Sequence, residues 1–212
     1  IADEELVKWL TARNEPAFRA RQIKQWLYAK WVINAAEMRN LPQILRDAIQ
    51  HDFTLFSLEA VERRDSADGS TKFLLRLTDG EHIETVLIRG RRWSTVCVST
   101  QVGCPVRCSF CASGRHGWRR DLAPVEMIDQ VVYACRELGA RVTNVVLMGI
   151  GEPLLNLDNV FPALAAMNDP ERLGIGARHI TVSTSGVVPG IYRLAGAGSQ
   201  WNLAWSVHGT TD

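Results

Sequence analysis

The stretch that decides the fold runs from residue 94 to residue 111 and reads STVCVSTQVGCPVRCSFC. Its first part is rich in β-formers and predicts a strand. Its second part holds Cys104, Cys108 and Cys111 in the spacing C-x3-C-x2-C. A glycine and a proline flank Cys104 and disfavour a helix, so we expect the three cysteines on a loop that wraps a bound group. That loop should lie at the carboxyl end of the strand before it, where α/β proteins form their sites.

Three thiolates on one loop can hold a zinc ion or an iron–sulfur cluster. A structural zinc ion takes four ligands, and His116 would be the fourth. A four-iron, four-sulfide cluster takes one protein ligand per iron, so three cysteines would leave one iron open for a small molecule. Inert buried thiols are the third alternative. The chain has five cysteines, an odd number, and its first residues, IADEELVKWL, lack an apolar signal core. A disulfide framework is therefore not expected.

From residue 93 onward, segments typical of strands and of helices alternate. The order is β-α-β-α-β-α-β, which is typical of a parallel α/β sheet. Four such strands do not close a barrel, so the sequence fits either a small open sheet or a part of a larger barrel. The expected strands are 94–100, 143–148, 179–184 and 202–207, and the expected helices are 124–138, 156–167 and 188–196.

The sequence pattern of residues 1–52 predicts a small helical domain. Apolar residues recur there at helical spacing, and Pro16 and Pro42 break or begin segments. The residues expected on the buried faces of these helices are Leu6, Val7, Leu10, Phe18, Ile23, Trp26, Leu27, Ile44, Leu45, Ala48 and Ile49.

Residues 53–92 change character and form a second region, a β-hairpin linker. The pairs Asp68-Gly69 and Asp79-Gly80 separate runs rich in β-formers, which is a strong signal for hairpins. We expect a small antiparallel sheet there. The third region, residues 93–212, then contains the parallel strands and the cysteine loop.

The composition is that of an ordinary globular protein, with 46% apolar and 22% charged residues. The net charge of +1 hides a basic segment, since residues 89–120 hold seven arginines and no acidic residue. A polyanion would respond to this segment more than to the net charge; the alternative is a solvated basic loop. No apolar run approaches the roughly 20 residues of a membrane helix, so we expect a cytoplasmic protein that does not contact membranes.

Taken together, these motifs resemble those of the dual-specificity radical SAM RNA methyltransferases, the RlmN/Cfr family. The cysteine spacing, with Phe110 before the last cysteine, is the hallmark of radical S-adenosylmethionine enzymes. The segments VCVSTQVGCPVRCSFCASG, NVVLMGIGEPLLNLDNV, ITVSTSGVVPGI and SVHG follow the family pattern in order, and FRARQIKQWLYAK resembles its helical accessory domain. The resemblance covers essentially the whole chain. It implies an α/β fold, a partial (β/α) radical SAM barrel preceded by the helical domain and the antiparallel segment.

The resemblance also implies cofactors and the residues that bind them. Cys104, Cys108 and Cys111 would hold a 4Fe-4S cluster whose open iron binds S-adenosylmethionine. Without this context, Glu152 would be a turn glutamate paired with an arginine, and His208 a hydrogen-bonded loop histidine. The family usually has alanine at the position of Gly209, a minor departure. The residues that match cofactor contacts of the family are Gly151, Glu152, Ser183, Ser206, Val207 and His208.

Two further residues match catalytic positions of the family. Glu84 corresponds to a glutamate near the target adenine that accepts a proton. Cys97 corresponds to a cysteine that resolves a covalent protein–RNA intermediate by thiol–disulfide exchange. The alternatives are an exposed strand glutamate and a buried strand cysteine that acts as a small hydrophobe. Cys135, on an apolar helix face, is expected to be such a hydrophobe.

The activity that the resemblance implies is methylation of an adenine of ribosomal RNA, and also of transfer RNA, through a 5′-deoxyadenosyl radical and a cysteine-linked intermediate. Adenine carbon-2 is the expected target atom. The expected partners are RNA and an electron donor such as flavodoxin, and the protein is expected to be a monomer. Two alternatives stay open, a radical SAM enzyme with another substrate and a zinc-stabilised RNA-binding fragment without catalysis.

The basic segment would bind this RNA. Arginines grip phosphates and tryptophans stack on splayed bases. Reversing the charge at Arg119 and Arg120 should therefore weaken RNA binding with little loss of the cluster. The residues concerned are Arg89, Arg91, Arg92, Arg115, Arg119 and Arg120, with Trp93 and Trp118 between them.

Family members continue beyond the point that corresponds to Asp212. They have further barrel strands, another cofactor-binding asparagine and a cysteine that carries the methyl group. The 212 residues therefore look like roughly the first three fifths of a family member. We expect this chain alone to hold every cluster ligand but not to methylate RNA.

Overall fold

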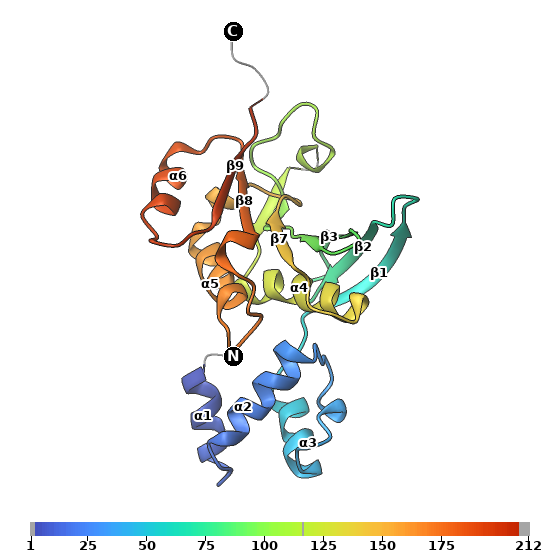
Figure 1. The fold of residues 1–212 in the computed structure, drawn as a ribbon, viewed down its shortest axis with the longest axis vertical. Coiled ribbons are helices and arrows are strands. Elements are labelled where there is room, and N and C mark those ends of the chain that lie inside the picture. Colours follow the sequence, from blue (N-terminus) through green and yellow to red (C-terminus); the bar gives the residue numbers. More distant parts are fainter. Residues whose placement is uncertain (1–2, 116, 208–212) are drawn as a thin grey trace.

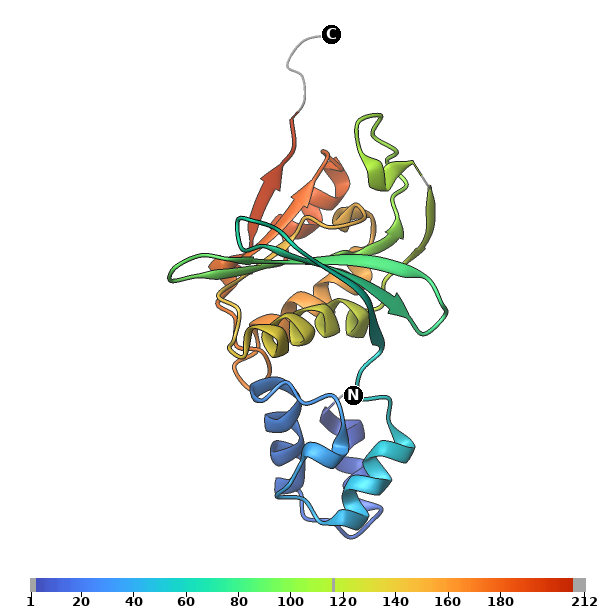
Figure 2. The same ribbon diagram turned by 90° about the vertical axis from the view of Figure 1, so that its right-hand side faces the viewer.

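A single seven-stranded sheet forms the centre of the molecule (Figure 1, Figure 2). The computed structural model describes residues 3–115 and 117–207. The strands lie across the sheet in the order β1-β2-β3-β4-β7-β8-β9. Their bounds are β1 Leu58–Asp65, β2 Thr71–Leu77, β3 His82–Arg89, β4 Ser94–Cys97, β7 Asn144–Leu147, β8 Ile180–Thr184 and β9 Asn202–Trp205.

The strands β4, β7, β8 and β9 run parallel, and a helix connects each to the next. The helices are α4 (Pro124–Leu138), α5 (Leu157–Asn168) and α6 (Val188–Ala195). In Figure 2, α4 and α5 lie below the sheet. The predicted α/β order is confirmed, and α4 has the predicted bounds. It begins at a proline and ends at Gly139, whose φ of +67° is the left-handed conformation that commonly closes a helix.

The antiparallel strands belong to the same sheet. β1, β2 and β3 form the two expected hairpins, and Gly69 and Gly80 have φ values of +84° and +87° in the turns. β3 then pairs antiparallel with β4. The expected antiparallel strands are therefore present, but they continue into the parallel strands as one sheet. The apolar side of β2, with Phe73 at its centre, shares one core with the parallel strands, and the pairing of β3 with β4 covers a strand edge that would otherwise be open.

The cysteine loop is the tip of a second, two-stranded sheet that the sequence did not predict. β5 (Gln101–Gly103) pairs antiparallel with β6 (Trp118–Asp121). Gly103 has a φ of +73°, and a Cβ atom there would overlap the carbonyl oxygen of Gly117, so glycine is required for the hairpin to close. Figure 1 shows the loop at the end of the molecule where the parallel strands terminate, far from the N-terminal helices.

The N-terminal part is helical, as expected, and has a core of its own. Its helices are α1 (Asp3–Thr11), α2 (Phe18–Lys24) and α3 (Gln43–Asp52), and a π-helical turn over Gln25–Ala29 extends α2. Val7, Phe18 and Ile44 are exposed instead of buried, Ile44 at 85%. These helices are short and cover one another only in part. The residues of this core are Leu6, Leu10, Ala20, Ile23, Val32, Ala35, Met38, Leu41, Leu45 and Ile49.

The main core lies between the sheet and the helices α4 and α5. Met127, Val131 and Cys135 are fully buried there, so Cys135 has the environment expected for a small hydrophobe. Val125, in the first turn of α4, is 47% exposed and, like Ile128 and Val132, lines a cavity. No helix in the described part of the chain is long and apolar enough to cross a membrane.

Candidate active site

The face of the sheet that lacks helices holds the two predicted catalytic residues. On β3, Thr85 is fully buried and donates a hydrogen bond to Gln130 of α4 over 2.7 Å. Glu84 is its neighbour in the strand and therefore points to the other face. Cys97 of β4 lies directly opposite Val86, two residues from Glu84. Residues opposite each other share a face, so Glu84 and Cys97 lie side by side on the open face.

Glu84 has an ion-pair partner on the neighbouring strand. Lys72 Nζ of β2 lies 2.8 Å from Glu84 Oε1, and the two side chains are 42% and 39% exposed. The carboxylate is thus held by a flexible cation and stays accessible to solvent. Sequence reasoning missed Lys72, although its place in the alternation between buried Thr71 and Phe73 marks it as a residue of the open face.

Cys97 is a free, half-buried thiol. Burial raises its pKa, and a hydrogen bond from the backbone N–H of Met148 acts in the opposite direction. The thiol is therefore mainly protonated near neutral pH. A thiol must lose its proton before it can attack a sulfur atom.

The three cysteines of the loop are also free thiols, and all are partly exposed. The backbone N–H of Cys104 donates to Gly117 over 3.1 Å, and that of Cys111 donates to Cys108 over 3.0 Å. Within residues 3–115 and 117–207, no three His, Cys, Asp or Glu side chains lie close enough to hold a metal ion. The donor set fits a thiolate-bound centre, because three uncommitted thiols share one loop tip. Binding would draw them together. His116 lies outside the described residues.

Cys104 of the loop and Glu152, which follows β7, interact electrostatically. Burial raises the pKa of Cys104, and hydrogen bonds from the backbone N–H groups of Val106 and Arg107 oppose this rise. The negative charges of Glu152 and Cys108 add to it. The Cys104 thiol is thus close enough to Glu152 for their charges to interact.

Glu152 is a buried carboxylate whose partners are all neutral. It is 3% exposed. One oxygen accepts the backbone N–H of Leu154 over 3.1 Å, and the other accepts the backbone N–H and the hydroxyl of Ser185 over 2.8 and 2.9 Å. The arginine partner considered above is not found among the described residues. An ionised carboxylate has about four acceptor positions, so one position is left for a charged donor.

Two glycines allow the segment after β7 to pack against the segment after β4. A Cβ atom at Gly149 would lie 2.7 Å from the backbone nitrogen of Ser99, and one at Gly151 would lie 2.8 Å from Cβ of Gln101. Gly151 also has a φ of +113°, which L side chains rarely adopt. These two glycines therefore permit close contact within the protein's own chain. Gln101 then accepts the backbone N–H of Glu152 over 2.8 Å.

The remaining predicted cofactor contacts lie at the ends of β8 and β9. Ser183 is half-buried, and its hydroxyl donates to the carbonyl oxygen of Leu147 over 2.7 Å. Ser206 and Val207 are exposed directly after β9. His208 lies outside the described residues. The described residues of this set thus gather at the carboxyl edge of the parallel strands, and their contacts with a cofactor stay a prediction.

Arg120 of the basic segment has a structural role. Its guanidinium lies 2.6 Å from Asp79 and 2.8 Å from each oxygen of Glu126. Glu126 is 7% exposed and also accepts the backbone N–H of Ala123 at the start of α4. The hydrogen bonds to Glu126 raise the pKa of Arg120. Charge reversal at Arg120 would also break this network, so its effect would include stability; the expected effect on RNA binding stays a prediction.

Several other arginines of the segment are more accessible. Arg119 pairs with Glu81 over 2.5 Å but is 64% exposed. Arg91, Arg92 and Arg115 are exposed, and their side chains form no ion pair within the described residues. These arginines are available to bind a polyanion.

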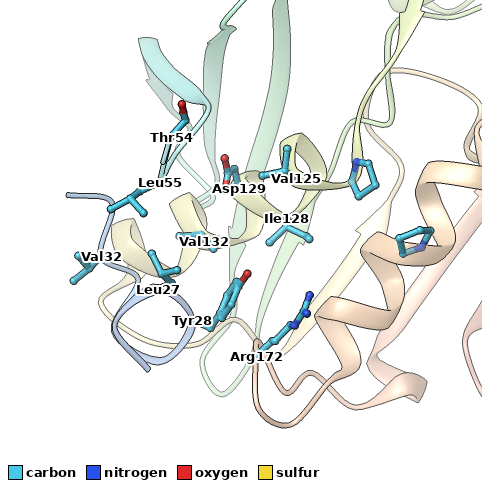
Figure 3. A pocket seen from close by; sticks show the side chains of 12 residues that line it. Leu27, Tyr28, Val32, Thr54, Leu55, Val125, Ile128, Asp129, Val132 and Arg172 are labelled. Atoms are coloured by element: carbon cyan, nitrogen blue, oxygen red, sulfur yellow. The ribbon is translucent and has the colours of Figure 1, made fainter. Parts of the chain in front are cut away.

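A cavity of ≈ 470 Å³ lies away from this site, between the N-terminal helices and α4 (Figure 3). Leu27 and Tyr28 line one side, and Ile128 and Asp129 of α4 line the other. Asp129 accepts the backbone N–H and the hydroxyl of Ser57, both over 2.7 Å, and burial raises its pKa to about 6. None of the predicted site residues lines this cavity, so we assign it to the junction between the helical part and the sheet.

The parallel strands, the cysteine loop at their carboxyl edge and the buried Glu152 define the class of protein. The family model described as "Radical SAM superfamily" matches residues 98–212. The chain belongs to the radical SAM superfamily. A second family model, "Ribosomal RNA large subunit methyltransferase N-terminal domain", matches residues 1–55.

The names of similar proteins indicate a narrower group within this superfamily. "Probable dual-specificity RNA methyltransferase RlmN" of Geobacillus kaustophilus (strain HTA426) is 47% identical over 99% of this chain and 58% of its own length. The protein of the same name from Halalkalibacterium halodurans is 50% identical over 97% of this chain and 58% of its own length. The crystal structure of a radical SAM methyltransferase from Sphaerobacter thermophilus has a TM-score of 0.93 and 43% identity, and covers 100% of this chain and 63% of that one. The chain thus spans 58% of the length of these curated relatives.

Proposed function

We propose that the protein is a radical SAM methyltransferase that modifies an adenine of ribosomal RNA, and also of transfer RNA. The observation that carries this proposal is the place of the cysteine loop, at the same edge of the sheet as buried Glu152 and next to the face that holds Glu84 and Cys97. The names of the relatives support it.

The cofactor side of the site would use the loop and the ends of the parallel strands. Cys104, Cys108 and Cys111 would hold a 4Fe-4S cluster, which together with S-adenosylmethionine supplies a 5′-deoxyadenosyl radical. Glu152 would accept a charge-assisted hydrogen bond from the ammonium group of S-adenosylmethionine. The segment after β7 would approach the cofactor at Gly151, and further contacts would come from Ser183, Ser206, Val207 and His208.

The substrate side would use the open face. Glu84 would leave Lys72 and accept a proton from the target adenine. Cys97 would attack, as a thiolate, the sulfur that links a second cysteine to the RNA. A disulfide would form as the sulfur–carbon bond breaks, and the electron pair of that bond would stay on the carbon of the RNA, which would then take up a proton. Because burial raises the pKa of Cys97, this step requires a base or a high pH. The exposed arginines beside the loop would bind the RNA backbone.

The remaining parts of the proposal concern partners and place. A one-electron donor of the flavodoxin kind would reduce the cluster. The protein would act as a monomer in the cytoplasm.

The first test is electron paramagnetic resonance on anaerobically reconstituted, reduced protein, with and without S-adenosylmethionine. We expect a four-iron signal that changes when S-adenosylmethionine is added. The Cys108→Ala variant should lose the signal, whereas Cys135→Ala, which removes a buried thiol away from the loop, should keep it.

Other outcomes separate the alternatives. About one zinc ion per chain without iron would favour the zinc-stabilised RNA-binding fragment. A four-iron signal that does not respond to S-adenosylmethionine would contradict the proposed cofactor site. A responsive signal in a protein that binds no RNA would favour a radical SAM enzyme with another substrate.

A further inference from the structure

A small notch on the open face holds four charges, and only Glu84 has a place in the chemistry above. The notch encloses ≈ 100 Å³, and its lining residues are Glu62, Arg64, Lys72, Leu74 and Glu84 from β1, β2 and β3. All of the charged side chains are between 39% and 68% exposed. A ligand can therefore reach them without a change in the backbone.

The strand register forces two cations together in this notch. Arg64 of β1 lies directly opposite Lys72 of β2. Like charges opposite each other destabilise a sheet. Two carboxylates offset this repulsion, because Arg64 Nε lies 2.6 Å from Glu62 Oε1 and Lys72 Nζ lies 2.8 Å from Glu84 Oε1.

Leu74 keeps the two carboxylates apart. It lies opposite Glu62 on one neighbouring strand and opposite Glu84 on the other. Glu62 therefore stays with Arg64 and cannot take over the role of Glu84. When Glu84 turns toward a nucleobase, Glu62 is the only carboxylate left in the notch beside Lys72 and Arg64. The notch then has an excess of positive charge.

We propose that a phosphate of the bound RNA takes the place of Glu84 in this notch. Arg64 and Lys72 form the phosphate site, and Lys72 is a positioning residue that holds Glu84 in the free protein and releases it when RNA binds. The inference rests on the proposed function, because it requires an RNA whose target base draws Glu84 away. It links the binding of one phosphate to the release of the proton acceptor.

The test measures RNA affinity by fluorescence anisotropy at several salt concentrations, with a labelled RNA hairpin that has one adenine in its loop. The variants are Lys72→Met, Lys72→Arg and the control Arg76→Met. Arg76 is on the same strand and the same face and pairs with Glu59. Thermal unfolding by circular dichroism verifies that each variant is folded.

Loss of one charged contact corresponds to roughly tenfold weaker binding. We expect this for Lys72→Met, together with a salt slope that is smaller by about 0.7 to 0.9, the value of one phosphate contact. Lys72→Arg should keep the affinity and the slope, because arginine also binds phosphate. Arg76→Met should leave both near the wild-type values. Equal losses in Lys72→Met and Arg76→Met would overturn the proposal.

A second measurement locates the phosphate. Methylphosphonate groups, which carry no charge, replace the phosphates beside the loop adenine one at a time. In the wild type one position should weaken binding, and in Lys72→Met that same position should have no further effect. RNA binding without such coupling would overturn this inference and leave the proposed function intact, whereas a protein that binds no RNA would overturn both.

Discussion

Ser185 donates both its backbone N–H and its hydroxyl to the same oxygen of Glu152, over 2.8 and 2.9 Å. Glu152 follows β7 and Ser185 follows β8, so these bonds join the ends of two neighbouring parallel strands at the candidate site. The other oxygen is fixed by Leu154. The carboxylate is therefore oriented before any ligand binds, which lowers the cost of binding one.

The Glu152→Gln variant tests this arrangement. An amide NH₂ group would face donors, so the free energy of unfolding should fall by about 1 to 3 kcal/mol. The affinity of the reconstituted protein for S-adenosylmethionine should fall by roughly tenfold or more, because a charge-assisted hydrogen bond is lost. Urea unfolding and isothermal titration calorimetry measure the two effects. The control is Glu59→Gln, at a side chain that is 64% exposed. It should change neither the free energy of unfolding nor the affinity for S-adenosylmethionine. Wild-type affinity in Glu152→Gln would remove Glu152 from the proposed cofactor site.

Arg120 should contribute to stability, whereas Arg119 should not. Arg120→Met leaves Glu126 buried without its cation, so we expect a loss of about 1 to 3 kcal/mol in the free energy of unfolding. Arg119→Met removes an exposed ion pair and should change that free energy by less than about 1 kcal/mol. Urea unfolding of both variants checks the difference. Equal stability of the two variants would show that the network around Glu126 is weak.

Cys97 should be slow to alkylate near neutral pH. Burial raises its pKa, and only the thiolate reacts, so its rate with iodoacetamide should rise steeply as the solution becomes more alkaline. Cys135, whose pKa burial raises to about 11, should react later still. Mass spectrometry of the metal-free protein follows each site separately. In urea the two cysteines should react at the same rate, and fast labelling of folded Cys97 at neutral pH would contradict the assigned environment.

Asp129 should make the protein less stable as the pH rises from about 4 to 6. Burial raises its pKa from 3.8 to about 6, so in this range the folded state binds more protons than the unfolded state, and stability falls with pH. Asp129→Asn should remove this dependence and keep the hydrogen bonds from Ser57. At neutral pH the variant should be more stable, by on the order of 2 to 3 kcal/mol.

The measurement is urea unfolding of both proteins at several pH values. Asp158→Asn is the matched control, because that side chain is 87% exposed. A constant difference between Asp129→Asn and the wild type across the acid range would show that Asp129 titrates normally.

The local parts of the fold could be predicted from the sequence. The two Asp-Gly pairs mark hairpins because glycine adopts the positive φ that such turns require, and α4 is bounded by its proline and Gly139. The β5–β6 hairpin could not be predicted, because its two strands are short and polar and depend on contact between Gly103 and Gly117. The pairing of β3 with β4 is a local hairpin closed over residues 90–93, but no Asp-Gly pair marks its turn, so the pattern that predicts the other two hairpins is absent there.

In the candidate site, too, some features could be predicted from the sequence and others could not. The cysteine spacing and the position of Glu152 after a strand are visible along the chain. The partners are not, since Ser185 reaches Glu152 across 33 residues and Arg120 reaches Asp79 across 41. Lys72 and Glu84 are each ordinary strand residues in the sequence, and only the strand register makes them a pair.

The pairing of β3 with β4 also limits how the spacing between Glu84 and Cys97 can change. Cys97 lies opposite Val86, two residues from Glu84 along β3, so the strand register sets the spacing between Glu84 and Cys97. A slip of one residue would turn Glu84 toward α4 and remove it from the open face. Their separation can therefore grow or shrink only in steps of two residues, about 6.8 Å each. An engineer who wishes to fit a larger base into this gap would have to reshape side chains, because the ladder permits no intermediate spacing.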